Sequence, residues 1–219
     1  MKANRLMFTL LLLSVAVFQL AGQQTEPDRK QVEEVKAKAE TGDAKAEYDL
    51  GLCYANGNNV AKDEVEAVKW FRKAAEQNYA KAQATLGFCY YDGQGVTKDE
   101  VEAVKWFRKA AEQNIAVAQG MLAACYDKGT GVTKDQVEAA KWSRKAAEQN
   151  DDVAQAALGF YYAMGQGVAK DYVKAYKWLA LAAGQGHVDA KNNMNILKNK
   201  MTPEQIAEGQ KLARDFKPK

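Results

Sequence analysis

The stretch EAVKWFRKAAEQN at residues 66–78 decides the fold of this chain, because close copies of it follow at a fixed interval. The copies read EAVKWFRKAAEQN at 102–114, EAAKWSRKAAEQN at 138–150 and KAYKWLALAAGQG at 174–186. Each copy holds one of the four tryptophans, which stand 36 residues apart at Trp70, Trp106, Trp142 and Trp178. A constant period of this length predicts a repeat protein, in which each unit buries its apolar face against its neighbours. Function is then expected where the copies differ.

Each repeat predicts two antiparallel helices. In the second copy the first helix spans about residues 80–92 and carries one apolar stripe, formed by Ala82, Leu86, Cys89 and Tyr90. Gly87 lies inside this helix, where glycine costs about 1 kcal/mol relative to alanine. We expect it to allow a neighbouring helix to approach closely. Gly93 suits the left-handed position that ends a helix.

The second helix of that copy is predicted to begin at Asp99 as the N-cap, with Glu102 completing a capping box. Asn114 is expected to act as its C-cap. Its inward side is predicted to consist of Val101, Val104, Trp106, Phe107, Ala110 and Ala111. We expect the tryptophans to be core residues and not a ligand cage, because they recur at a structural spacing.

The ends of the chain differ from the repeats. Lys2 and Arg5 precede the apolar run Leu6–Leu20, which is shorter than the roughly 18–20 residues that span a bilayer. Residues 1–22 are therefore predicted to be a cleaved signal peptide, so that the protein is exported, periplasmic or secreted, without membrane insertion. Residues 202–205, TPEQ, predict the capped start of a last helix.

These patterns predict an all-α fold, a solenoid of four 36-residue helix-turn-helix repeats between capping helices. The predicted segments are a linker and N-terminal capping helix at 23–42, repeats at 43–78, 79–114, 115–150 and 151–186, and C-terminal capping helices at 187–219. Without Lys2 and Arg5 the 31 basic residues become 29, against 28 acidic ones. This near-neutral balance argues against a nucleic-acid partner.

Cys53, Cys89 and Cys125 occupy one position in three successive repeats, and Tyr161 takes that position in the fourth. Neighbouring packed helices lie about 8–10 Å apart, so equivalent positions should be about 10 Å or more apart. A disulfide needs Cα atoms within roughly 7 Å. We expect buried thiols between helices, and the sequence leaves any redox role open.

Candidates for catalysis are few. Beyond residue 22 the chain has one serine, Ser143, at the position of Phe71 and Phe107, and Ala146 three residues later excludes an S-x-x-K motif. The single histidine, His187, falls in a predicted turn and is expected to be solvated. Without a Cys/His cluster the sequence predicts no metal site and no cofactor. The chain is therefore not expected to be an enzyme.

The chain resembles the Sel-one-like repeats, relatives of the tetratricopeptide repeats with a longer turn. The matching pattern is Ala82-Leu86-Gly87-Tyr90-Gly93-Gly95-Val96-Asp99-Ala103-Trp106-Ala110-Ala111. The resemblance implies a right-handed αα superhelix that acts as a scaffold or adaptor for protein partners in exported bacterial proteins. One cysteine-rich branch, with paired cysteines in each repeat, implies the alternative of an envelope hydrolase of β-lactamase or penicillin-binding type. This chain departs from that branch, since it has one cysteine per repeat.

Recognition is expected on the first helices, which line the inner surface of such a superhelix. Positions beside the Leu-Gly-Tyr stripe vary between copies, and the predicted partner-binding groove consists of Tyr48, Leu52, Lys81, Phe88, Tyr91, Asp92, Asp127, Lys128, Phe160 and Met164. Aromatic and methionine side chains are enriched in protein interfaces. The alternative is that Phe88 and Phe160 pack under the adjacent repeat. The partner, an unidentified protein or peptide, and the oligomeric state are left open.

Overall fold

The computed structural model describes residues 26–218, and all regular structure in that range is helical. The helices are α2 (Glu26–Glu40), α3 (Ala44–Asn56), α4 (Glu64–Glu76), α5 (Ala80–Asp92), α6 (Glu100–Glu112), α7 (Ala116–Lys128), α8 (Gln136–Glu148), α9 (Asp152–Met164), α10 (Tyr172–Gly184), α11 (Val188–Lys198) and α12 (Pro203–Arg214). Within these residues no helix is long and apolar enough to cross a membrane. The predicted signal peptide at 1–22 lies outside the described residues.

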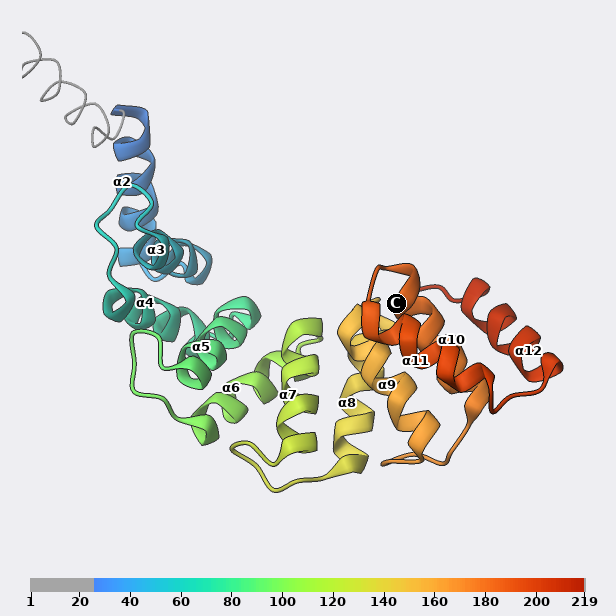
Figure 1. Ribbon diagram of the computed structural model, residues 1–219. Helices are drawn as coiled ribbons and strands as arrows, with labels where there is room; N and C mark the ends of the chain where they lie inside the picture. The colour runs from blue at the N-terminus through green and yellow to red at the C-terminus, as the bar shows by residue number, and fades with distance from the viewer. Residues whose placement is uncertain (1–25, 219) are drawn as a thin grey trace, which may run out of the picture.

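The helices follow one curved path, and from α2 to α11 each contacts the next along the chain (Figure 1). Four pairs, α3/α4, α5/α6, α7/α8 and α9/α10, are the helix-turn-helix repeats. At one end α2 packs on α3, and at the other α11 and α12 both pack on α10. The predicted all-α solenoid is confirmed.

The interior of the second repeat is made by the predicted positions, with one exception. The four tryptophans are between 4% and 8% exposed, which confirms them as core residues. Gly87 has the predicted role, since a Cβ there would lie 2.6 Å from the Phe107 ring. The inward assignment of Val101 is wrong: its side chain is 55% exposed, because it lies in the first turn of α6, away from the packed side.

The helix ends also follow the sequence in most respects. Gly93 caps α5 in the left-handed region at φ 76°, and the Asp99 side chain accepts from the Glu102 backbone N–H at 2.9 Å. The predicted capping box at Asp99 does not close. Its backbone N–H already donates to the Tyr90 carbonyl, and the Glu102 carboxylate pairs with Lys105 at 2.9 Å.

The C-terminal end of α6 differs from its prediction, and the N-terminal end of α12 agrees with it. Gln113 is the C-cap of α6, and Asn114 stands one residue beyond it at φ 65°, so its predicted cap role shifts by one position. At α12 the reciprocal box between Thr202 and Gln205 is present, as predicted. That helix covers the last repeat, with the Phe216 ring 5.4 Å from Trp178 between centroids.

A buried amide ladder connects the repeats, and sequence reasoning missed it. The Gln83 side chain, 2% exposed, donates to the Ala75 carbonyl at 3.1 Å and to Asn78 Oδ1 at 3.1 Å. Gln113 of the next helix donates to Gln83 Oε1 at 2.7 Å. Gln119 and Gln155 repeat these bonds one and two repeats later. The ladder satisfies polar groups at the helix junctions, which would be costly to bury unpaired.

Candidate functional site

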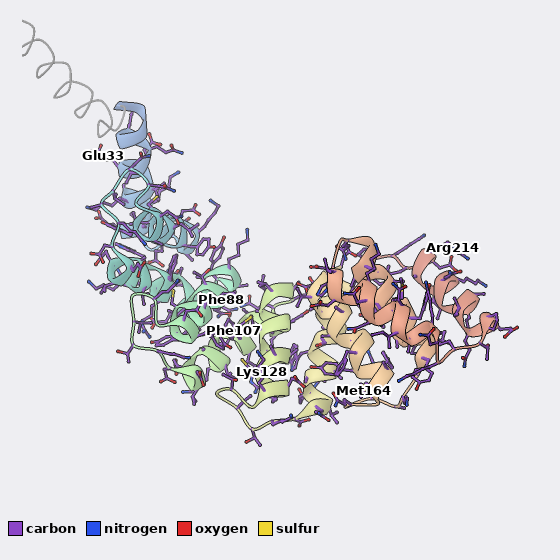
Figure 2. All side chains as sticks on the ribbon, in the orientation of Figure 1. Glu33, Phe88, Phe107, Lys128, Met164 and Arg214 are labelled. Atoms are coloured by element: carbon purple, nitrogen blue, oxygen red, sulfur yellow. The ribbon has the colours of Figure 1, made fainter. Side chains whose placement is uncertain are left out.

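The predicted groove residues lie along the first helices α3, α5, α7 and α9, with different exposures. Those that stand free of the core are Phe160 and Met164 on α9, which are 44% and 56% exposed. The charged residues Lys81, Asp92 and Lys128 are also exposed. The half-buried ones are Tyr48, Leu52, Phe88, Tyr91 and Asp127. Figure 2 shows Lys128 and Met164 near the C-terminal ends of α7 and α9.

The half-buried aromatic residues pack against the second helix of their own repeat. The Phe88 ring lies 5.1 Å from Phe107 and Tyr91 lies 6.2 Å from it, between ring centroids (Figure 2). Tyr48 makes a similar contact with Phe71 at 5.7 Å. One part of each of these side chains therefore packs against the core, and the other part is exposed on the groove. Phe160 contacts Tyr161 of its own helix, at 6.4 Å, and remains exposed.

Three hollows lie along the row of first helices, which the capping helix α11 continues after α9. Each has a residue of the intervening second helix in its wall. The hollow between α3 and α5 has a volume of about 310 Å³ and includes Leu52, Phe71 and Phe88. The hollow between α9 and α11 measures about 120 Å³ and includes Phe160 and Met164. Such concave, partly apolar sites are where proteins hold ligand side chains.

The hollow between α7 and α9, here called the third-repeat pocket, measures about 350 Å³. Its apolar walls are Val117, Met121, Ala123, Ala124, Val153, Ala154 and Ala157. Asp127, Lys128, Ser143, Asp151 and Tyr161 supply its polar groups. Sequence reasoning included Asp127 and Lys128 in the groove but missed this pocket. The available clue was that Ser143 and Tyr161 both depart from the pattern of the other copies.

The electrostatics of the third-repeat pocket centre on Tyr161, which is 5% exposed. Burial, the Asp127 charge and a hydrogen bond to Asp127 raise the pKa of Tyr161 to about 12, while a hydrogen bond from Ser143 acts in the opposite direction. The phenol is therefore neutral at ordinary pH and bridges Ser143 and Asp127. The carboxyl group of Asp127 lies next to an apolar wall, and this favours a cationic group on a ligand.

The residues weighed for catalysis have structural surroundings. Ser143 is 2% exposed and hydrogen-bonds Tyr161, a group that stays protonated and is a poor general base. His187 caps α11, its Nδ1 accepting from the Ala190 N–H at 3.3 Å, which gives the turn histidine a role beyond the solvated one expected. Within residues 26–218, no group of three or more His, Cys, Asp or Glu could hold a metal ion.

The three cysteines are free, as the spacing argument predicts. Cys89 and Cys125 are buried, and Cys53 in the first repeat is half-buried. Burial raises the pKa of Cys89 and of Cys125 to about 11, assisted by Asp92 at Cys89 and by Glu100 at Cys125. Thiols held protonated in this way are poor nucleophiles and poor metal ligands.

Comparisons with known proteins place this geometry in context. Four segments, 44–79, 80–115, 116–151 and 152–187, match the Sel1 repeat. The structure resembles that of c5321, described as a protective antigen of uropathogenic Escherichia coli with an SLR fold. The TM-score is 0.75 at 40% identity, over 84% of this chain and 40% of c5321. A Sel1 repeat protein from Oxalobacter formigenes gives a TM-score of 0.71 at 36% identity, over 81% of this chain and 75% of that one.

A shorter sequence match connects the chain to EsiB, the secretory immunoglobulin A-binding protein of Escherichia coli O6:H1 strain CFT073. The two are 49% identical over 43 residues, which are 20% of this chain and 9% of EsiB. The chain thus spans a small part of EsiB and less than half of c5321.

Proposed function

The chain belongs to the Sel1 repeat family, with four repeats over residues 44–187, and on that basis we propose that it is a non-catalytic adaptor. It binds a segment of a partner protein along the groove formed by the first helices α3, α5, α7 and α9. The observation that carries this proposal is the series of hollows along the row of first helices. Solenoids use such repeated surfaces to bind extended ligands.

The residues at the hollows support a protein partner. Of the ten predicted groove residues, six line the three hollows: Leu52, Phe88, Asp127, Lys128, Phe160 and Met164. Exposed Phe160 and Met164 offer apolar area at low cost, because binding removes it from water without unpacking the core. Aromatic and methionine side chains with charges around them are typical of interface cores.

Export is the second part of the proposal. The basic start and apolar run at residues 1–22 predict a signal peptide. The relatives are described as a protective antigen and as a secretory immunoglobulin A-binding protein, both of pathogenic Escherichia coli. Secretory immunoglobulin A is the partner of EsiB by its name, and we carry over to this chain only the expectation of a protein partner outside the cytoplasm.

The exposed residues of α9 give a cleaner test of the groove than the packed aromatics of α5. Phe160→Glu together with Met164→Glu places two charges on the groove with little effect on folding, because both side chains already meet water. The matched control is Val137→Glu, a 63% exposed valine on the second helix α8. Folding of each variant is checked by circular dichroism and denaturant unfolding.

Partners are captured from envelope and extracellular fractions with the wild-type protein and both variants. We expect a purified partner to bind wild type and Val137→Glu with equal affinity, and the α9 variant at least about tenfold more weakly. Equal binding to all three proteins would contradict the groove. Edman sequencing of the natively expressed protein tests export, and an N-terminus near residue 23 is the expected result.

A further inference from the structure

The third-repeat pocket occupies the space that the protein's own aromatic side chains fill in the second repeat. There, Phe88, Tyr91 and Phe107 form a ring cluster, with centroids 5.1 Å and 6.2 Å from Phe107. The equivalent residues 36 positions later are Ala124, Asp127 and Ser143. All three rings are therefore missing from the third repeat at once.

The neighbouring residues fill only part of the space. Tyr161 of α9 stands where α7 has Cys125, and its ring is the one aromatic addition, hydrogen-bonded to Ser143 and Asp127. Ala123 stands where the second repeat has Gly87, and it adds a single methyl group opposite Ser143. A Cβ added at Gly120 would meet nothing within 4 Å, so the wall of α7 is open there. The result is the cavity of about 350 Å³ between α7 and α9. Proteins pack their interiors tightly, so a cavity of this size that opens on a surface is suited to a ligand group.

We propose that the third-repeat pocket is the anchor site of the groove, and that it takes one aromatic side chain of the partner segment next to a basic residue. The proposal rests on the adaptor function proposed above. The partner's ring takes the place that Phe88 occupies in the second repeat, against Ala123, Ala124 and Val153. The comparison with the second repeat therefore defines the shape of the side chain that the pocket takes.

The charges at the pocket define the neighbouring residue of the partner. Asp127 and Asp151 line the pocket with one cation, Lys128, so carboxylates outnumber cations. Lys128 is fully at the surface, whereas Asp127 is half-buried beside Tyr161. A lysine or arginine next to the aromatic residue reaches Asp127, and an acidic residue at that place is repelled. Partly desolvated pairs of this kind give specificity more than raw affinity.

The same internal comparison supplies the test variant. Ala124→Phe restores the Phe88 ring of the second repeat inside the third and leaves the hydrogen bonds of Tyr161 to Ser143 and Asp127 in place. Ala124 is half-buried in the pocket wall, so the new ring enters existing space and this filled variant is expected to fold, which denaturant unfolding checks. Ala123→Gly is the control on the same helix, because it leaves the pocket open.

The experiment selects ligands from a displayed library of random peptides of about 12 residues, long enough to span roughly 40 Å when extended. The wild-type protein is the bait, and binding of the selected peptides is then measured to each variant. We expect the peptides to share an aromatic residue beside lysine or arginine. Filling the pocket should weaken the binding of these peptides about tenfold or more, because one ring of the peptide can no longer be buried. Ala123→Gly should bind as wild type does, and Asp127→Asn should weaken binding about threefold.

Other outcomes overturn the proposal, and they separate it from the adaptor function. Peptides that bind the filled variant as well as wild type, yet are lost with Phe160→Glu and Met164→Glu, would refute the anchor site and leave the groove in place. Selected peptides without a shared aromatic residue would also refute the anchor. Failure of the library to yield any peptide for the wild-type protein would count against both proposals.

Discussion

At the scale of single residues, each tryptophan is held by two different kinds of contact. The ring is buried between helices, and a lysine of the same helix covers its remaining face. The lysine Nζ lies 3.8 Å from the ring centroid at Trp70, 4.0 Å at Trp106, 4.3 Å at Trp142 and 4.2 Å at Trp178. The repetition of both contacts in four copies identifies the tryptophan position as structural. In the first three repeats this lysine stands three residues after the tryptophan, and at Trp178 the preceding residue, Lys177, takes the same place over the ring.

Replacing Trp106 by alanine should destabilise the protein by about 3–5 kcal/mol, because it removes a side chain that is 5% exposed and leaves a cavity. Val101→Ala provides the comparison in the same helix, where the side chain is 55% exposed and we expect a change of about 0.5 kcal/mol or less. Denaturant unfolding measures both. Equal stability of the two variants would refute the core assignment of the tryptophan.

The cysteines should differ in reactivity although they occupy one repeat position. Burial raises the pKa of Cys89 and Cys125 from 9.0 to about 11, so the reactive thiolate is scarce at pH 8. The pKa of Cys53 is raised as well, but its side chain is half-buried and reachable. We expect a thiol reagent to label Cys53 fast and the other two only as fast as the protein opens. Mass spectrometry of timed samples would identify the labelled residue, and equal rates would contradict the burial argument.

The same groups set a pH dependence of stability. The folded protein holds the protons of Cys89, Cys125 and Tyr161 more tightly than the unfolded chain does, since all three pKa values are raised. The contribution of the two cysteines is complete below pH 9 and is lost as the pH rises through about 11, and that of Tyr161 is complete below pH 10 and is lost as the pH rises through about 12. Unfolding free energy should fall over this range. Replacing Cys89 and Cys125 by alanine should flatten the fall, whereas Cys53→Ala should change it less.

At the scale of helices, two polar ladders join each repeat to the next. One is the buried amide ladder of glutamine and asparagine side chains. The other joins second helices to the following first helices: Arg72 donates to the Tyr90 hydroxyl, Arg108 to Tyr126 at 2.6 Å and Arg144 to Tyr162 at 2.7 Å. Directional bonds at a constant spacing fix the register of stacked helices, while the apolar core supplies most of the stability.

The first repeat has a defect in the amide ladder, at Glu47, the position of Gln83 in the next repeat. Gln77 donates to its carboxylate at 2.7 Å, but Glu47, 4% exposed, has no N–H with which to reach the Ala39 carbonyl. Glu47→Gln should therefore raise the unfolding free energy by about 1 kcal/mol. The reverse change, Gln119→Glu, should lower it by about 1–3 kcal/mol. If both substitutions raised the unfolding free energy, or both lowered it, the bond from the glutamine side chain to the backbone carbonyl would not stabilise the protein.

Sequence patterns predicted the helices well and the contacts between repeats poorly. The caps, the stripe around Leu86 and the role of Gly87 follow from local rules, because the residues concerned lie within one helix or one pair. The amide ladder joins Gln83 to Gln113, whose pairing depends on how the repeats stack. The third-repeat pocket likewise depends on three absences, at Ala124, Asp127 and Ser143, which come together only when α7, α8 and α9 are packed.

At the scale of the whole molecule, neighbouring repeats are joined by contacts between a loop and a helix. The loops of the second and third repeats contact the start of the preceding second helix, where Gly95 lies against Glu64 and Gly131 against Glu100. A Cβ at Gly131 would lie 2.1 Å from the Glu100 carbonyl oxygen. The first repeat has Asn59 at this position, at φ 60°, beside an open hollow shared with α2. A side chain is tolerated there because the hollow between α2 and this loop leaves room for it.

The difference between Asn59 and Gly131 allows the backbone strain of a positive φ to be separated from the loss of packing between two repeats. Gly131→Asn keeps a residue that accepts positive φ, as Asn59 does, but places a side chain against the start of α6. We expect a loss of about 2–4 kcal/mol and a weaker coupling between the second and third repeats. Hydrogen exchange should then show α3–α6 and α7–α10 opening at different free energies, as units of a solenoid do when one interface is weakened. Asn59→Gly should leave both the stability and the exchange pattern within about 0.5 kcal/mol of wild type. A Gly131→Asn protein that still opens as one unit would show that the loop contact does not carry the coupling.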